Sequence, residues 1–332
     1  MASPAKESLI TYSQLSDLEK EFDDVDREII RYQAELTRPL YEKRQKVVDQ
    51  IPNFWALVLE QAPPEIDGHI HPSDSQVLLT SLTSLWVSRF EIENGGTGNP
   101  RSVAIRFEFA PNAYFEDTVL EKKFWYRRSK GGWGGLVSEP VDIKWKPGKD
   151  LTGGLLSMVK AVWDEEQAAA AGSNGAAKKG SGELTPKQKA LKNKIENTGV
   201  GGQSFFAWFG YRGKAVSAEE SRITAEEEQQ QRQLRATSSS SADQQTKEAA
   251  EDEDDDDEDD LEIFPDGEML ALAISDDLWP GALWFFTQAQ EEEEDGQSED
   301  DFESEEEGDD EGDDDAPQDG SPGARPAKKR KA

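Results

Sequence analysis

The chain has 332 residues and a formal net charge of −33 at pH 7, with 70 acidic against 37 basic side chains. It contains no cysteine, which excludes disulfides, thiolate metal sites and thiol catalysis, and its negative field disfavours nucleic acid as the main partner. Residues Met1–Tyr12 lack the apolar segment of a secretory signal. The longest apolar stretch, Met269–Phe286, is too short and too charged to cross a membrane, so we expect no membrane partner.

The first expected element is a long helix. Thr11 and Gln14 fit a capping box, and the apolar residues that follow are spaced alternately by three and four. These seam residues are Leu15, Leu18, Phe22, Val25, Ile29, Tyr32 and Leu36. Pro39 interrupts the seam, and the apolar rhythm resumes out of phase, which predicts one helix over about 14–50 with a kink or bend near Pro39. Such a helix, about 55 Å long, favours homodimerisation; packing against its own chain is the alternative.

The next segment predicts short helices followed by strands. Residues 54–61 and 73–82 read as helices, and residues 85–93 as a half-buried strand. Apolar and polar residues then alternate strictly over 103–109. A further strand pair, 120–128 and 137–145, flanks a glycine-rich turn. This order predicts an α+β fold built on an antiparallel β-meander.

The C-terminal half alternates between polar and aromatic stretches. Residues 167–182 read as a flexible linker, 185–195 as a short helix, and the aromatic run 205–209 as part of the core. Residues 217–260 are polar and predict disorder, whereas 261–286 predict a final helix packed on the sheet.

The charge is concentrated near the C-terminus. Residues 251–319 carry 34 acidic side chains and no Lys or Arg. The acidic tail cannot fold alone, because like charges repel and little apolar surface offsets the chain entropy. We interpret the run as built to meet a strongly cationic protein. A purely solubilising tail is one alternative, and a calcium-binding run, which would lack the spacing of an EF-hand, is another.

No motif predicts catalysis, a cofactor or a metal site. His69 and His71 are the only histidines and read as a surface-loop pair, while no glycine cluster resembles a phosphate-binding loop. We therefore expect no enzyme. The basic cluster at 325–331 predicts a nuclear import signal through Lys328, Lys329, Arg330 and Lys331, with an electrostatic latch onto the acidic run as the alternative.

Five stretches carry a family likeness. They are Arg38–Arg44 leading to Ile51–Trp55, then Tyr114–Leu120, Ile143–Thr152, Ser204–Phe209 and Asp276–Pro280. In these positions the chain resembles the nucleosome assembly protein family, and within it the SET (template-activating factor) type. The resemblance covers residues 14–163 and 203–290. The insertion at 217–260 and the basic end depart from the pattern and look like a fungal-type elaboration.

The resemblance implies a headphone-shaped dimer, with a band of two long helices and an α+β "earmuff" domain at each end. The implied organisation is a disordered N-terminus (1–12), a dimerisation helix (13–52), an earmuff (53–163 and 203–290), a linker (164–202), a disordered insertion (212–260), an acidic tail (291–320) and an import signal (325–331).

The resemblance also implies a function. Family members are ATP-independent histone chaperones, so we expect core histones as partners and the nucleus as location. A histone-presenting cofactor of a histone acetyltransferase and an inhibitor of a serine/threonine phosphatase are alternatives. The implied histone-binding residues are Asp266, Glu268, Asp276, Asp277, Glu116 and Asp117. Positions Ala207 and Gly210 replace polar family residues, so those contacts are not expected here.

Overall fold

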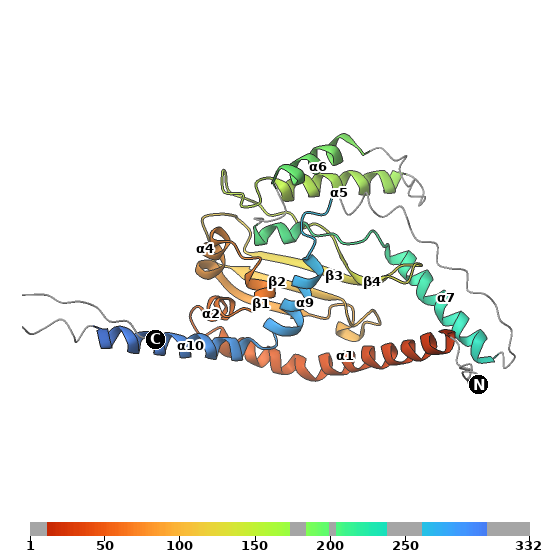
Figure 1. The fold of residues 1–332 in the computed structure, drawn as a ribbon, viewed down its shortest axis with the longest axis horizontal. Coiled ribbons are helices and arrows are strands. Elements are labelled where there is room, and N and C mark those ends of the chain that lie inside the picture. Colours follow the sequence, from red (N-terminus) through yellow and green to blue (C-terminus); the bar gives the residue numbers. More distant parts are fainter. Residues whose placement is uncertain (1–11, 173–183, 199–203, 238–260, 304–332) are drawn as a thin grey trace, which may run out of the picture. The chain divides into compact units, whose positions relative to one another are not determined.

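The computed structural model describes residues 12–172, 184–198, 204–237 and 261–303 (Figure 1). The chain divides into a first unit, Met1–Ala289, and a second, Gln290–Ala332. The first unit contains the long helix α1 (Tyr12–Val48) and an α+β domain with a four-stranded antiparallel sheet, so the expected fold class is confirmed. None of the described helices combines the length and apolarity needed to cross a membrane.

The sheet is a meander whose strands pair in chain order. The strands are β1 (Leu82–Ser88), β2 (Val103–Phe109), β3 (Val119–Arg128) and β4 (Gly134–Ser138). Alternate side chains are buried along each strand, because successive residues of a strand point to opposite faces. One face therefore forms the core, through residues such as Ile105, Phe107 and Phe124, while Arg106 and Lys123 on the other face are exposed.

The aromatic run predicted to return to the core does so as a 3₁₀ helix, η2 (Phe205–Gly210). Phe107 on β2 contacts the rings of Phe205, Trp208 and Phe209, with ring centroids 5.8–6.2 Å apart. Short helices surround this core on the remaining sides. They are α2 (Phe54–Glu60), α3 (Pro64–Asp67), α4 (Pro72–Ser81), α5 (Leu155–Gly172) and α6 (Pro186–Thr198).

Lys122 of β3 lies on the core face although its side chain carries an ionisable amino group. Its ammonium is fully buried and donates hydrogen bonds of 3.0 Å to the carbonyls of Glu139, Phe209 and Tyr211. Burial lowers the pKa of Lys122 to about 7, and the carboxylates of Glu262 and Glu139 oppose that shift. One side chain thus joins β3, the segment after β4 and η2.

Two strand predictions were wrong in their limits. β1 covers 82–88 rather than 85–93, because a turn closed by the hydrogen bond from Ile92 N to Arg89 O ends the strand. β4 covers 134–138 rather than 137–145. Pro140 has no backbone donor. Val141 N bonds instead to Phe209 O of η2 at 2.9 Å and Ser138 N to Arg212 O at 2.7 Å, so the chain leaves β3 and pairs with η2 and the residues after it.

Two segments predicted to lack structure contain helices. α5 continues to Gly172, inside the predicted linker 164–202, whereas α6 (Pro186–Thr198) confirms the short helix predicted over 185–195. Within the predicted disordered insertion at 212–260, residues Ala218–Thr237 form α7, which packs on β3. The polar sequence concealed this helix because ion pairs, rather than an apolar face, attach it. Residues 173–183, 199–203 and 238–260 lie outside the described part.

The predicted final helix is divided. α9 (Gly267–Leu272) continues into a π-helical turn, η3 (Ala273–Leu278), and α10 (Ala282–Glu303) follows after Pro280 and Gly281. α10 runs past residue 290, where the sequence placed the start of the tail, because Glu and Gln are good helix formers. The remainder of the predicted acidic tail, the import signal and the predicted N-terminal segment 1–11 lie outside the described residues.

Helix α1 continues through Pro39 without interruption. All seven predicted seam residues are 50–65% exposed, and Leu40 and Val47 are exposed as well. At 100° per residue these nine side chains fall within roughly 100° of arc, so Leu40 and Val47 belong to the same stripe rather than to a new phase. We call this surface the α1 stripe. In the single chain, nothing among the described residues covers it.

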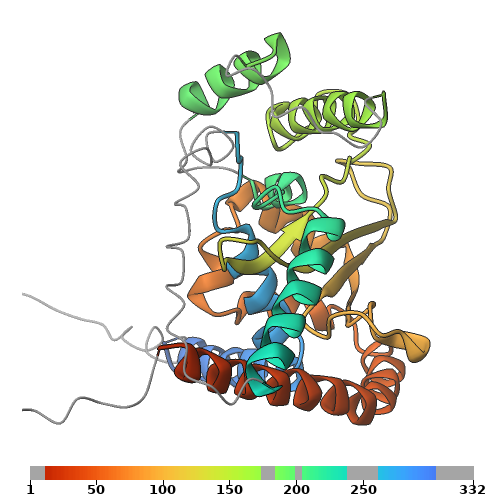
Figure 2. The same cartoon turned by 90° about the vertical axis from the view of Figure 1, so that its right-hand side faces the viewer.

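The opposite side of α1 is fastened to the domain at two places. Near its C-terminal end, the Arg44 guanidinium lies 4.8 Å from the Tyr41 ring and 4.7 Å from the Trp279 ring, and donates to Trp279 O at 2.5 Å. Near its N-terminal end, Asp23 accepts from Arg101 at 2.6 Å and Arg128 at 3.1 Å. α7 lies beside this second place in both views (Figures 1 and 2).

Candidate functional site

The α9–η3 segment runs between the two edges of the sheet. At the β4 edge, the Glu268 carboxylate accepts a hydrogen bond of 2.8 Å from Leu136 N. At the β1 edge, the Trp279 indole donates to Leu85 O at 3.1 Å. Both bonds satisfy backbone groups that an edge strand would otherwise expose. The segment is therefore held in place at its two ends.

One side of this segment faces solvent and mixes acidic with apolar residues. The exposed side chains are Asp266, Met269, Leu272, Asp276 and Asp277. The π-helical turn, in which Trp279 N bonds to Ile274 O at 3.0 Å, inserts an additional residue into the helix at this point. As a result both adjacent aspartates are exposed while Ser275 and Leu278 are buried. We call this surface the acidic face.

The predicted residues of this face differ in their availability. Asp276 accepts a 2.6 Å bond from Arg89. Asp266 and Asp277 are exposed, and neither side chain has a hydrogen bond or ion pair recorded among the described residues. Glu268 is half-buried; burial raises the pKa of its carboxyl, and the bond from Leu136 opposes the shift. Glu268 therefore caps the sheet edge, whereas Asp266 and Asp277 point two carboxylates to solvent.

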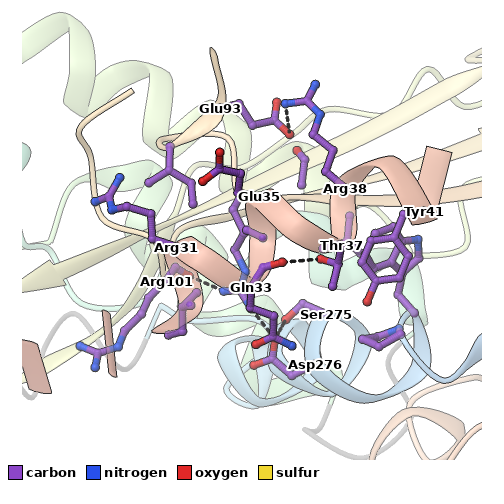
Figure 3. A pocket seen from close by; sticks show the side chains of 18 of the residues that line it. Arg31, Gln33, Glu35, Thr37, Arg38, Tyr41, Glu93, Arg101, Ser275 and Asp276 are labelled. Carbon is purple, nitrogen blue, oxygen red and sulfur yellow. Dashed lines mark hydrogen bonds and ion pairs between the residues drawn. The ribbon is translucent and has the colours of Figure 1, made fainter. Parts of the chain in front are cut away.

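A cleft of about 890 Å³ separates the acidic face from the inner side of α1. Figure 3 shows Arg31, Glu35 and Arg38 of α1 on one side and Ser275 and Asp276 of η3 on another. Cations and anions alternate around it, and several are already paired within the chain. Arg38, for instance, lies 3.7 Å from the Glu93 carboxylate. Such a lining suits a polypeptide with mixed polarity better than a small ion.

The other two predicted site residues, Glu116 and Asp117, are not part of this surface. They precede β3, whereas Glu268 contacts β4 opposite Tyr126, roughly 23 Å further along that strand. Asp117 accepts a 2.7 Å bond from Lys144 N and lies 3.5 Å from its ammonium. The structure thus gives Asp117 a local role in fixing the bridge between Phe115 and Trp145.

Among the described residues, neither histidine belongs to a group of three or more His, Asp or Glu side chains that could hold a metal ion. His69 packs its ring 5.1 Å from that of Phe264, and His71 is the N-cap of α4.

Sequence reasoning missed the ion pairs that join α1 to α7. The signal was present in the Asp23–Asp24 pair on the polar side of the predicted helix, but its partners lie 78 to 208 residues away.

The fold and the site define an α+β domain with an acidic face, carried on a long helix with an exposed apolar stripe. The family model for nucleosome assembly protein (NAP) matches residues 19–289. The chain therefore belongs to the nucleosome assembly protein family.

Individual relatives match parts of the chain. A Schizosaccharomyces pombe protein whose name places it among nucleosome assembly proteins is 39% identical over 155 residues, covering 44% of this chain and 61% of the relative. Protein SET of Drosophila melanogaster is 36% identical over 126 residues, covering 37% of this chain and 43% of that protein. The crystal structure of Vps75 shares the fold, with a TM-score of 0.50 at 21% identity, covering 84% and 98% of the two chains.

Proposed function

We propose that this chain is an ATP-independent histone chaperone. It binds core histones, screens their positive charge and so promotes nucleosome assembly and disassembly. The observation that carries the proposal is the acidic face, set on a domain of the nucleosome assembly protein family and followed by a long acidic run. Histones are strongly cationic, and charge complementarity gives both encounter rate and specificity. The function needs no catalytic group, since equilibrium competition with DNA is sufficient.

Within the acidic face we assign different roles to the predicted residues. Asp266 and Asp277 contact basic histone side chains directly, because both carboxylates face solvent. Met269 and Leu272 between them supply apolar contact. Asp276 exchanges its partner Arg89 for a histone cation. Glu268 supports the face by holding the edge of β4.

We further propose that two copies pair through the α1 stripe in antiparallel orientation. Residues 12–30 carry seven acidic and two basic side chains, while residues 31–48 carry two acidic and five basic. An antiparallel pair places the acidic half of each helix against the basic half of the other, and it also opposes the helix dipoles. A parallel pair would place like charges together.

The seam spacing supports a particular register. If the two-fold axis passes between residues 30 and 31, Ile29 of each helix meets Tyr32 of the other and Val25 meets Leu36. Phe22 then meets Pro39, with Leu40 beside it. The pair thus has an apolar centre, and each copy carries its acidic face on a domain at opposite ends of the band. We assign the basic cluster at 328–331 to nuclear import.

The test of histone binding is a titration of core histones by the full chain across a salt series. Asp266→Asn with Asp277→Asn should weaken binding about 5- to 10-fold at physiological salt, and the effect should shrink as salt screens the charges. Glu108→Gln with Glu121→Gln is the matched control: it removes the same charge from the outer face of the sheet and should change affinity less than 2-fold. Equal losses for the two pairs would show that only net charge matters and would remove the acidic face from the proposal.

A further inference from the structure

Two large apolar side chains at the start of α10 are exposed in the single chain. Leu283 is 54% exposed and Trp284 is 61% exposed, whereas Ala282 and Phe285 on either side are buried. An exposed tryptophan beside an exposed leucine is a costly surface for a highly charged protein, and it indicates a partner. Building on the antiparallel dimer, we propose that Leu283 and Trp284 form a second dimer contact and receive Leu18 and Leu15 of the partner subunit.

Like the α1 stripe, the exposed side of the first turn of α10 faces away from the domain. Phe286 stacks on Phe54 of α2 at 4.9 Å, so the buried side of α10 is the side that faces the domain. α1 also faces the domain with the side opposite its stripe, where Val48 is buried and Gln45 bonds to Ser84 of β1. The exposed sides of α1 and of the first turn of α10 therefore both point away from the domain.

The first turn of α10 also lies beside the C-terminal end of the stripe. Arg44 donates to the carbonyls of Trp279 and Pro280, at 2.5 and 3.4 Å. Trp284 follows Pro280 after one turn, closed by the bond from Trp284 N to Gly281 O. Figure 1 shows the start of α10 next to this end of α1. The apolar pair therefore extends the surface that carries Leu40 and Val47.

The register explains why the stripe needs such an extension. With the two-fold axis between residues 30 and 31, Leu18 of one copy stands opposite Lys43 of the other, and Leu15 opposite Lys46. The outer layers of the seam thus lack an apolar partner on α1 itself. Leu283 and Trp284 follow Pro280, whose carbonyl accepts from the neighbouring Arg44, and we assign them as this missing apolar partner.

The contact connects dimerisation to the acidic face. α9, η3 and the first turn of α10 form one short connected segment, and its exposed residues include Asp277 in its middle and Trp284 near its C-terminal end. Docking of the partner subunit on Trp284 would hold the end of this segment.

The experiment is a double-mutant cycle on the full chain, with dimer dissociation measured by sedimentation equilibrium and by subunit-exchange fluorescence. Trp284→Ala should raise the dimer Kd about 10-fold or more, and Leu18→Ala by a similar factor. Because the two side chains contact each other, the double variant should lose much less than the product of the two factors. Met269→Ala, which truncates another exposed apolar residue of the same segment, is the control and should leave the Kd within 2-fold. Trp284 is exposed in the single chain, so the far-UV circular dichroism spectra of the single variants should match that of the wild type.

Four outcomes would overturn the inference. If Trp284→Ala leaves the Kd unchanged, or if its effect multiplies fully with that of Leu18→Ala, the two residues do not meet. If Trp284→Ala weakens histone binding and not dimerisation, the apolar pair belongs to the histone surface. A wild-type chain that stays monomeric at all concentrations would overturn both the dimer and this contact. Loss of the wild-type dimer in Ile29→Asp would support pairing through the α1 stripe, and the mutant cycle then tests the Trp284 contact separately.

Discussion

Two charged side chains, Lys122 and Asp23, each join segments that are distant in sequence, but they do so in different surroundings. Lys122 is fully buried and bonds to three backbone carbonyls. Asp23 is 22% exposed and bonds to the guanidinium groups of Arg101 and Arg128. The first holds the core of the domain together; the second attaches the N-terminal half of α1 to the sheet.

The difference teaches where this protein is rigid and where it is adjustable. A buried cation with fixed carbonyl partners is shielded from salt, and removal leaves buried acceptors without donors. A partly exposed ion-pair network is screened by salt and contributes less. The network around Asp23 also includes α7, through Arg128 with Glu228 at 3.2 Å and Arg232 with Asp24 at 2.6 Å. We therefore expect the domain to be constant, and the attachment of α1 to depend on solution conditions.

The largest effect should come from Lys122→Met. The variant keeps the side-chain volume but leaves the carbonyls of Glu139, Phe209 and Tyr211 without their donor, which should lower the free energy of unfolding by about 3 kcal/mol. Urea denaturation followed by tryptophan fluorescence measures it. Lys123→Met, one residue further along and exposed, is the control and should change stability by less than about 0.5 kcal/mol. Equal effects would show that the buried bonds are not what stabilises the core.

Lys122 should also make stability depend on pH on the alkaline side. Its pKa is about 7 in the folded chain, against 10.5 for an ordinary lysine. Between these values the unfolded chain binds more protons than the folded chain, so the free energy of unfolding rises with pH. The slope is at most about 1.4 kcal/mol per pH unit. Urea curves between pH 7 and pH 10 measure it, and Lys122→Met should flatten the slope; an unchanged slope would contradict the assignment.

A smaller effect should follow from Asp23→Asn. Removing the carboxylate shared by Arg101 and Arg128 should cost about 1 kcal/mol at low salt and clearly less at 0.5 M salt. Hydrogen exchange of α1 and α7 should increase more than that of the sheet. Asp26→Asn on the exposed side of the same helix turn is the control. If the loss of stability does not change with salt, the Asp23 ion pairs are shielded from solvent as the Lys122 hydrogen bonds are, and the contrast between the two residues is wrong.

The smallest expected effect is the contribution of Asp23 to the loss of stability at acid pH. Burial would raise the pKa of Asp23, but Arg101, Arg128 and Arg27 together hold it below its usual value. Its contribution to stability is therefore complete above the unfolded-state pKa of about 4 and disappears as pH falls through the lower folded-state value. Asp23→Asn should weaken the stability loss in this acid range. The measurement is the free energy of unfolding between about pH 2 and pH 5. The same pH dependence in the variant and the wild type would contradict this prediction.

The sequence predicted the parts of the fold whose signal is local. The 3-4 spacing from Leu15 to Leu36 predicts the long helix and its exposed seam, because a helix presents every third or fourth residue on one side. The alternation over 103–109 predicts a half-buried strand for a similar reason. Local patterns did not reveal α7 or the short β4. α7 is attached by ion pairs to residues far away in the chain. β4 ends where backbone groups of Phe209 in η2 and Arg212 after it accept hydrogen bonds from Val141 and Ser138.

The candidate site was only half accessible to sequence reasoning. The sequence by itself determined that acidic residues lie on the last segment of the domain and that the chain has a polyanionic end, because charge is a property of composition. Only the tertiary structure decided that Asp266 and Asp277 face solvent, that Arg89 pairs with Asp276 and Leu136 N with Glu268, and that Asp117 bonds locally at the other end of β3. Which carboxylate is available to a partner depends on the distance to groups from other strands, and no local pattern encodes that distance.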